Sequence, residues 1–267
     1  MKKNLVVAGA MLGAVALLSG CGAGIGFGPS NQDVVSYDVA GSLKSLDVTT
    51  NSGDIVVNAS DRQGVHVTET LRWRGKKRPE TEHPVSGGTL TLRQNCARDC
   101  EVHYRVEIPK GLDVTTDTGS GTITLRGLKG AKATAKTGSG DIEAGSSEVG
   151  ELTAETGSGA VTLRGLKGED VRAESGSGDI DARSLTARTF TAESGSGAVE
   201  AGFADAPDQV TVKADSGDVT LRLPRNTYAL TLDTGSGDKT VQVGNDSASP
   251  RKVEARTGSG NIDVLPS

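Results

Sequence analysis

Aromatic residues and histidines are scarce in this 267-residue chain, and positive charge is not in excess. Aromatic side chains make up 3% of the sequence, which leaves few flat surfaces on which sugars could stack. The formal net charge is −5, with both signs dispersed along the chain, whereas a nucleic-acid-binding protein needs a basic patch or stripe. These shortages argue against a nucleic-acid partner and weaken the case for a carbohydrate-binding protein.

The sequence patterns of common catalytic sites are also missing. The three histidines, His66, His83 and His103, lie outside the regular part of the sequence and lack zinc-protease spacing. Gly-Ser-Gly recurs, but between strand-like segments, whereas a nucleophile elbow or a phosphate-binding loop leads into a helix. We therefore expect no enzyme activity, no cofactor and no metal site.

The chain does contain a repeat. From Thr118 to Ala198 the phrase Thr/Ser-Gly-Ser-Gly returns every nineteen residues. A fixed period near twenty residues is typical of a solenoid, in which single units stack because none can bury its apolar face alone. The middle serine of the phrase stands at Ser120, Ser139, Ser158, Ser177 and Ser196, with looser copies at Ser52, Ser216, Ser236 and Ser259.

Each repeat holds two segments with strand periodicity. Ile123 and Leu125 alternate with threonines, and Ala133 and Ala135 alternate with polar residues, the pattern of strands with one buried face. Strands at this spacing must pair in parallel with the same strand of the next rung, and parallel crossovers are almost always right-handed. The sequence predicts an all-β, single-domain parallel β-solenoid (β-helix), right-handed, with 19–20 residues per rung.

The glycines of the phrase are predicted to form the corners between rungs. We expect positive φ there, because Asn51 and Asp215, which replace the first glycine, are the next most tolerant residues of that conformation. The aligned serines could also hydrogen-bond along the stack. The predicted structural corners are Gly119, Gly121, Gly138, Gly140, Gly157, Gly159, Gly176, Gly178, Gly195 and Gly197.

Residues 1–20 are interpreted as a signal peptide. Lys2 and Lys3 precede an apolar run that is short for a transmembrane span. The run ends in Leu-Ser-Gly-Cys21, which resembles the lipobox of bacterial lipoproteins and implies cleavage before Cys21 and lipidation of its thiol. An ordinary secretory signal with an incidental cysteine is the alternative. Residues 21–33 would then be a Gly-rich tether, and the expected location is the outer face of the cytoplasmic membrane, lipid-anchored.

Residues 34–267 are predicted to form the solenoid, with an excursion at about 71–110. Outside the cytoplasm disulfides persist, so Cys96 and Cys100 are expected to clip a hairpin; two thiolates alone fall short of a structural zinc site. The excursion also carries the only tryptophan, Trp73, which could close the open end of the solenoid. Alternatively, Trp73 and its basic neighbours could contact a cell-wall polymer or an envelope protein. These neighbours are Arg72, Arg74, Lys76 and Lys77.

Two rows of acidic residues deserve a functional hypothesis. Glu155, Glu174 and Glu193 share one rung position and should form a ladder, which could recruit a cation or serve a polysaccharide-cleaving site, although a solvated face is the simpler interpretation. Aspartates also follow some corners, but the rungs between carry threonine or alanine there, which argues against calcium. They are Asp141, Asp179, Asp218 and Asp238.

The chain resembles a known family. The Ser36-Tyr-Asp-Val entry, the Cys96…Cys100 hairpin, the Tyr104…Gly111 segment and the Thr-Gly-Ser-Gly-Asp-Ile repeats are similar to the bacterial putative-adhesin family of β-strand-repeat domains. The resemblance covers residues 33–265 and implies a parallel β-solenoid exposed on the cell envelope, with no catalytic residues to carry over. We therefore expect a lipoprotein that acts as an adhesive or structural binding module. A polysaccharide-acting β-helix enzyme and an extracytoplasmic sensing domain with a protein partner are the alternatives.

Overall fold

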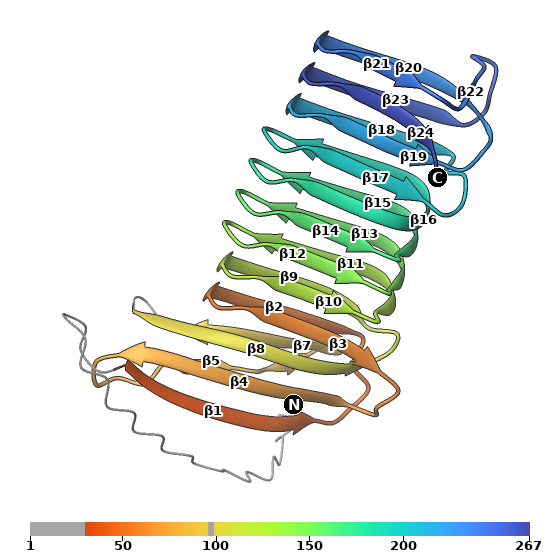
Figure 1. Cartoon of the computed structure of the whole chain (residues 1–267). Coiled ribbons are helices and arrows are strands. Elements are labelled where there is room, and N and C mark those ends of the chain that lie inside the picture. Colours follow the sequence, from red (N-terminus) through yellow and green to blue (C-terminus); the bar gives the residue numbers. More distant parts are fainter. Residues whose placement is uncertain (1–29, 96–98) are drawn as a thin grey trace.

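The computed structural model describes residues 30–95 and 99–267. The predicted signal peptide, Cys21 and most of the predicted tether lie outside these residues, as does Cys96. Figure 1 shows the described chain as an elongated stack of rungs, with the N-terminal strands at one end. None of the residues described forms a helix that is long and apolar enough to cross a membrane.

Each rung of the stack contributes one strand to each of two faces. In order of pairing, face A consists of β1 (Ser30–Val39), β4 (Val65–Arg74), β8 (Cys100–Pro109), β3 (Ile55–Ser60), β10 (Ile123–Arg126), β12 (Ile142–Gly145), β14 (Val161–Arg164), β16 (Ile180–Ser194), β17 (Val199–Phe203), β19 (Val219–Leu223), β24 (Ile262–Pro266) and β21 (Lys239–Val241).

Face B starts with β5 (Glu80–Glu82) and β6 (Val85–Ser86), which both pair with β7 (Thr89–Asn95). It continues through β2 (Ser45–Ser52), β9 (Asp113–Ser120), β11 (Lys129–Thr137), β13 (Glu148–Thr156), β15 (Lys167–Ser175), the second half of β16, β18 (Gln209–Ser216), β23 (Lys252–Ser259) and β20 (Thr227–Ser236). The short β22 (Gly244–Asn245) pairs with the start of β20.

The central rungs confirm the predicted parallel β-solenoid. Ile123 pairs with Ile142, which pairs with Val161 and then with Ile180, always in parallel. These side chains are at most 1% exposed, so each face turns one alternate set of side chains inward. The interior is a single apolar column that the alanines of face B keep narrow.

At both ends the stack departs from chain order, which corrects the expectation that successive rungs pair throughout. The rung of β23 and β24 lies between that of β18 and β19 and that of β20 and β21. Likewise, β2 and β3 lie between β7 and β8 on one side and β9 and β10 on the other. Ser52 therefore stacks on Ser120, and Ser259 stacks on both Ser216 and Ser236.

The corner glycines are required by close packing between rungs. A Cβ on Gly138 would lie 2.5 Å from the carbonyl oxygen of Gly119, and one on Gly140 or Gly159 would lie closer still to the corner glycine of the preceding rung. Of the ten predicted corner glycines only Gly121 has a φ in the left-handed range, at 157°. The expected positive φ is therefore wrong for the other nine, and the reason for glycine is the absence of space for a side chain.

Hydrogen bonds across the corners come from the residue before the first glycine. Thr156 Oγ1 donates to the carbonyl of Gly140 (2.8 Å) and accepts from the N–H of Gly159 (3.1 Å). Ser175 and Ser194 repeat this pair of bonds in the next two rungs. The middle serines, by contrast, are exposed, so the expected serine ladder is replaced by a buried Thr/Ser ladder.

The aspartates that follow the corners also join rungs. Asp141 Oδ1 accepts the backbone N–H of Ala160, and Asp179 Oδ1 accepts that of Ala198, both at 2.8 Å. An aspartate in one rung thus bonds the same position of the next rung, where the side chain can be alanine. This gives the alternation of aspartate and alanine a structural reason.

The last rung of the stack has its open edge partly covered. Ala229 N donates to Arg251 O on the β23 side, so the backbone groups of Tyr228, Leu230 and Leu232 point to the open edge. Tyr228 O accepts from Asp246 N at 2.9 Å, Leu230 N donates to Asn245 Oδ1 at 3.3 Å, and Leu232 O accepts from Lys239 Nζ at 3.0 Å. Such coverage discourages edge-to-edge association. Pro266, near the C-terminal end of the sequence, pairs with Leu223 inside the stack and does not cover this edge.

Candidate functional site

The end of β4 carries the best candidate for a contact surface. Arg72, Arg74, Lys76 and Lys77, which we call the basic tip, are all exposed. Trp73 is half-buried and packs against the core. Trp73 thus adds to the core at the end of β4 while its four cationic neighbours face solvent, and its role as a lid stays a prediction. A depression of about 420 Å³ beside the tip is lined by Ser52, Arg72, Trp73, Arg74, Asp99, Cys100 and Glu101.

The basic tip is held beside the first described residues of the chain. In the antiparallel pair of β1 and β4, Ser30 lies opposite Arg74. Asn31 Nδ2 donates to the carbonyl of Gly75 at 2.9 Å. One further cation of this segment, Arg78, is paired with Asp33 at 2.8 Å. The tip and the start of β1 thus form one corner of the molecule.

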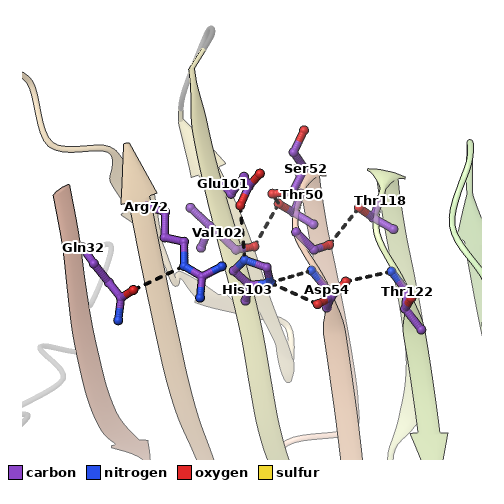
Figure 2. A network of polar contacts seen from close by, with 11 residues as sticks. Gln32, Thr50, Ser52, Asp54, Arg72, Glu101, Val102, His103, Thr118 and Thr122 are labelled. Atoms are coloured by element: carbon purple, nitrogen blue, oxygen red, sulfur yellow. Dashed lines mark hydrogen bonds and ion pairs between the residues drawn. The ribbon is translucent and has the colours of Figure 1, made fainter. Parts of the chain in front are cut away.

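A polar network lies next to the tip on the outer face of β1, β4, β8 and β3 (Figure 2). Arg72 Nε donates to Gln32 Oε1 at 3.3 Å. His103 lies between two carboxylates, since its Nδ1 is 3.3 Å from Asp54 Oδ2 and its Nε2 is 3.5 Å from Glu101 Oε2. Asp54 N–H donates to His103 Nδ1 at 3.1 Å, so the imidazole proton is on Nε2 in the neutral ring and points toward Glu101.

The hydroxyls in this network are engaged by the backbone. Thr50 Oγ1 donates to the carbonyls of Ser52 and Val102, both at 3.2 Å, and Thr118 Oγ1 donates to that of Gly53 at 3.1 Å. Figure 2 shows these threonines joining rungs, with His103 directed to the two carboxylates. A nucleophile needs its hydroxyl bonded to a base, and neither threonine has that geometry. The network therefore holds strands together, and its two threonines form no nucleophile–base pair.

A buried carboxylate occupies the interior of the N-terminal end. Glu69 in β4 is 1% exposed. Its two oxygens accept hydrogen bonds from Tyr37 Oη and Thr81 Oγ1, both at 2.6 Å. The Tyr104 side chain is buried nearby, and its hydroxyl has no hydrogen-bond partner among the described residues. Burial, together with the charge of Glu69, raises the pKa of both tyrosines well above the ordinary value.

Removing the hydroxyl of Tyr37 should change the free energy of unfolding much more than removing that of Tyr104. Tyr37→Phe removes a donor from a buried carboxylate and should lower the free energy of unfolding by about 1–3 kcal/mol. Tyr104→Phe removes a hydroxyl that has no hydrogen-bond partner among the described residues, so the expected change is within about 0.5 kcal/mol or is a gain. Urea unfolding of the two variants measures both values, and equal losses would contradict the assigned hydrogen bonds.

The loss of stability at alkaline pH provides a second test of the two buried tyrosines. A tyrosine whose pKa is raised by folding contributes stability that is present below its unfolded pKa of about 10 and is lost as the pH rises above that value. The wild-type protein should therefore lose stability above pH 10. Tyr104→Phe should lose less over the same range, because one of the two perturbed groups is gone.

The carboxylate ladder forms as predicted, but with charge partners. Glu155, Glu174 and Glu193 pair in register on face B. Lys136 Nζ lies 2.7 Å from Glu155, and Arg172 contacts both Glu174 and Glu193. The bond to Glu155 raises the pKa of Lys136. Partly exposed ion pairs of this kind hold a solvated face, which favours the simpler interpretation of the row.

On face A, a row of arginines and a row of carboxylates neutralise each other in the same way. Arg164 and Arg183 stack in register, as do Asp181 and Glu200. Asp181 lies 3.0 Å from Arg164 and 2.7 Å from Arg183, and Glu200 lies 2.8 Å from Arg183. Like charges in neighbouring rungs are thus interleaved with opposite ones, and the arrangement leaves no isolated pair of carboxylates for acid–base chemistry.

The two covalent predictions concern residues outside the described part of the chain. Cys21 is one of them, so its lipidation stays a prediction. Cys100 opens β8, but Cys96 is not described, and the Cys96–Cys100 disulfide also stays a prediction. The Glu69 cluster was missed at the sequence level, although one signal was available. Glu69 occupies an inward position in the alternation of Val65, Val67, Leu71 and Trp73.

The fold and its surface define a parallel β-solenoid that is closed at its N-terminal end by antiparallel strands and carries ion-paired rows outside. The model of the family described as Toastrack DUF4097 matches residues 43–265. The chain therefore belongs to the Toastrack family, and the resemblance to adhesin-like β-repeat domains is confirmed. No curated protein matches the chain.

Solved structures share this fold at low sequence identity. A "putative adhesin" from Bacteroides fragilis has a TM-score of 0.51 at 13% identity and covers 87% of this chain and 97% of its own. A "putative adhesin" from Parabacteroides distasonis has a TM-score of 0.52 at 12% identity with the same coverage. A "putative lipid binding protein" from the same organism has a TM-score of 0.51 at 15% identity and covers 88% and 97%.

Proposed function

We propose that this protein is a lipid-anchored envelope protein whose β-solenoid acts as an adhesive or structural binding module without catalysis. The N-terminal rungs, with the basic tip, lie nearest the tether and the predicted lipid on Cys21. The central rungs then carry the binding faces away from that point. The ligand would be a wall polymer or another envelope protein, which contacts several rungs at once.

The observation that carries this proposal is that the charged side chains of the central rows and the hydroxyls of the corners are already engaged in ion pairs and hydrogen bonds. The carboxylates of the central rows are ion-paired, as in Lys136–Glu155 and Arg183–Glu200. Threonines of the corners donate to backbone carbonyls, as Thr156 does to Gly140. Such a surface offers repeated polar contacts on a rigid support, whereas catalysis needs a poised acid, base or nucleophile. The descriptions of the structural neighbours as adhesins and a lipid-binding protein agree with this interpretation.

The test is a binding screen in which turnover is followed at the same time. A soluble form that starts at residue 22 contains every described strand and the whole core, and is incubated with purified cell-wall polymers, envelope extracts and a glycan array. We expect saturable binding without product formation. Glu174→Gln, in the middle of the carboxylate ladder, should leave any turnover reading at background.

Three outcomes separate the alternatives. Release of oligosaccharide that Glu174→Gln abolishes would overturn the non-enzymatic proposal in favour of a polysaccharide-acting enzyme. Crosslinking to a single envelope protein, with no binding to any polymer, would favour an extracytoplasmic sensing domain. Saturable polymer binding by both the wild type and Glu174→Gln would support the adhesive module.

A further inference from the structure

The N-terminal end of face A finishes in a strand whose outer edge is open. β1 pairs with β4 along its whole length, from Ser30 opposite Arg74 to Val39 opposite Val65. Figure 1 shows β1 as the outermost strand at that end of the stack. Apart from one contact within β1 itself, no residue of 30–95 or 99–267 bonds its other edge. The unpaired backbone groups of such an edge are a template for pairing with another strand.

The hydrogen bonds of β1 show which of its backbone groups point to the open edge. In an antiparallel pair, residues that exchange backbone bonds alternate with residues that do not. The N–H of Val34 donates to Oδ1 of Asp33 at 2.9 Å, so it is not directed to β4. Ser36 follows two residues later, and its Oγ lies 3.0 Å from Thr68 Oγ1, the close side-chain approach of a pair without backbone bonds. The residues of this set, whose N–H and C=O groups point to the open edge, are Gln32, Val34, Ser36 and Asp38.

The other strand edges at the ends of the described stack are short or covered. β5, β6 and β21 are only two or three residues long, and the open side of β20 is occupied by Asp246, Asn245 and Lys239. Short strands, lysines, prolines and bulges are the usual protection of an edge. β1 has none of them, since it contains no lysine or proline and pairs with β4 without a register shift. One end of the stack is thus protected and the other is open.

We propose that β1 pairs antiparallel with β1 of a second copy of this chain, about a two-fold axis, and so joins two stacks end to end. Val34 is the middle residue of 30–38, so an axis at Val34 brings all the open-edge groups into register. Val34 then lies opposite its own counterpart, and Gln32 lies opposite Ser36 of the second copy. Because both copies use the same surface and the far end is covered, the assembly closes at two copies and forms no filament.

An apolar side chain at the axis favours a second copy as the occupant of this edge. Val34 is 48% exposed, and only Val85 and Val241 are comparably exposed large apolar side chains among the described residues. In the paired arrangement the two copies of Val34 lie side by side and remove each other from water. A strand of unrelated sequence would offer no such match at the centre of β1.

The charges beside the edge are also self-complementary. Arg72 lies beside Gln32 near one end of β1, and Asp38 lies near the other end. Antiparallel pairing therefore brings the Arg72 end of each copy toward Asp38 of the other. Arg62 and His66 both contact Asp38 through Oδ1, which leaves Oδ2 for this attraction.

The experiment measures the mass of the soluble form from residue 22 at increasing concentration. One added strand pair is a small interface beside the roughly 1,200 Å² of a stable complex, so we expect a weak dimer with a dissociation constant of about 10–200 µM. Light scattering should give one copy at about 2 µM and mainly two copies at about 500 µM, with nothing larger. Hydrogen exchange at the higher concentration should show new protection of the open-edge amides of β1 and no change in β24.

A matched pair of variants places the contact. Val34→Lys puts two like charges next to each other at the axis and should weaken the dimer about ten-fold or more. Val241→Lys makes the same change at a valine that is 42% exposed in β21 at the far end, and should change the dissociation constant less than about three-fold. Ser36→Pro removes an N–H from the open edge without removing a bond to β4, so it should also abolish the dimer. Circular dichroism and melting verify that all three variants stay folded.

Crosslinking tests the register. Two residues that exchange backbone bonds have their Cα atoms about 5.5 Å apart, a distance that a disulfide can bridge. Oxidised Val34→Cys should therefore form a covalent dimer at high concentration, whereas the wild-type soluble form should not. Gln32→Cys alone should crosslink poorly, because its two copies are four residues apart along the paired strands. A mixture of Gln32→Cys and Ser36→Cys should crosslink efficiently.

Several results would overturn the proposal. A monomer at every concentration would remove the contact, and protection of the β1 amides that appears only with an envelope extract would assign the edge to another protein. A mass that rises beyond two copies would mean that the far end also pairs. Equal weakening by Val34→Lys and Val241→Lys would place the contact elsewhere. None of these results bears on the polymer screen of the proposed function, which follows ligand binding and needs no dimer.

Discussion

Gly159→Ala is expected to lower the free energy of unfolding by about 3 kcal/mol or more. The new Cβ would overlap the carbonyl oxygen of Gly140 in the preceding rung, and both backbones are fixed by the bonds of Thr156. Inserting even one methyl group into a well-packed interior costs about 1–3 kcal/mol when side chains can adjust. Here the obstacle is backbone, which adjusts less. Thermal and urea unfolding measure the loss.

Two neighbouring substitutions separate packing from backbone strain. Ser158→Ala changes the exposed middle residue of the same corner and should alter stability by no more than about 0.5 kcal/mol. Gly165 has a φ of +60° with nothing within 4 Å of its added Cβ, so Gly165→Ala should cost only the left-handed penalty of about 1–2 kcal/mol. If Gly159→Ala cost no more than Gly165→Ala, the overlap with the Gly140 carbonyl would not be the reason for glycine at this corner.

The regular rungs could be predicted because their signal is local. Residues nineteen apart, such as Ile142 and Val161, share the same alternation and the same corner, so parallel pairing follows from the period alone. The order of the end rungs could not be predicted in the same way. Val253 stacks between Val210 and Leu230, yet any of these strands offers the same inward pattern to its neighbour. The period identifies a rung without specifying which rung lies next to it.

The candidate site also has one part that the sequence predicts and one part that it does not. The basic tip is visible in the sequence because its four cations lie within six residues and no acidic residue stands between them. The Glu69 cluster is not, because Tyr37, Thr81 and Tyr104 come together only once β1, β5 and β8 have been placed around β4. Antiparallel pairing at that end follows no repeat. The inward position of Glu69 indicates a buried acid, but not the hydroxyls that satisfy it.

Ile142→Asp should have the largest effect of any single change on a strand. Ile142 is fully buried between Ile123 and Val161, within a column of apolar side chains. A buried charge without a partner is very costly, so we expect a loss above about 4 kcal/mol, a large part of the 5–15 kcal/mol that stabilises a typical domain. Far-ultraviolet circular dichroism and the melting temperature measure it. Thr153→Asp puts the same side chain on the outer face of β13, in register with Thr134 and Arg172, and should leave both nearly unchanged.

The set of strands that Ile142→Asp destabilises tests the stacked architecture as well as the inward direction of the Ile142 side chain. Each central rung contacts only its two neighbours, so stability in such a stack is a sum of rung and interface contributions. Ile142→Asp removes two adjacent interfaces in the apolar column, those with Ile123 and with Val161. Hydrogen exchange should therefore show lost protection centred on β10, β12 and β14, with β19 and β24 affected least. Uniform loss along the whole chain would mean that the stack unfolds as a single cooperative unit, and unchanged exchange in β12 would mean that Ile142 does not point inward.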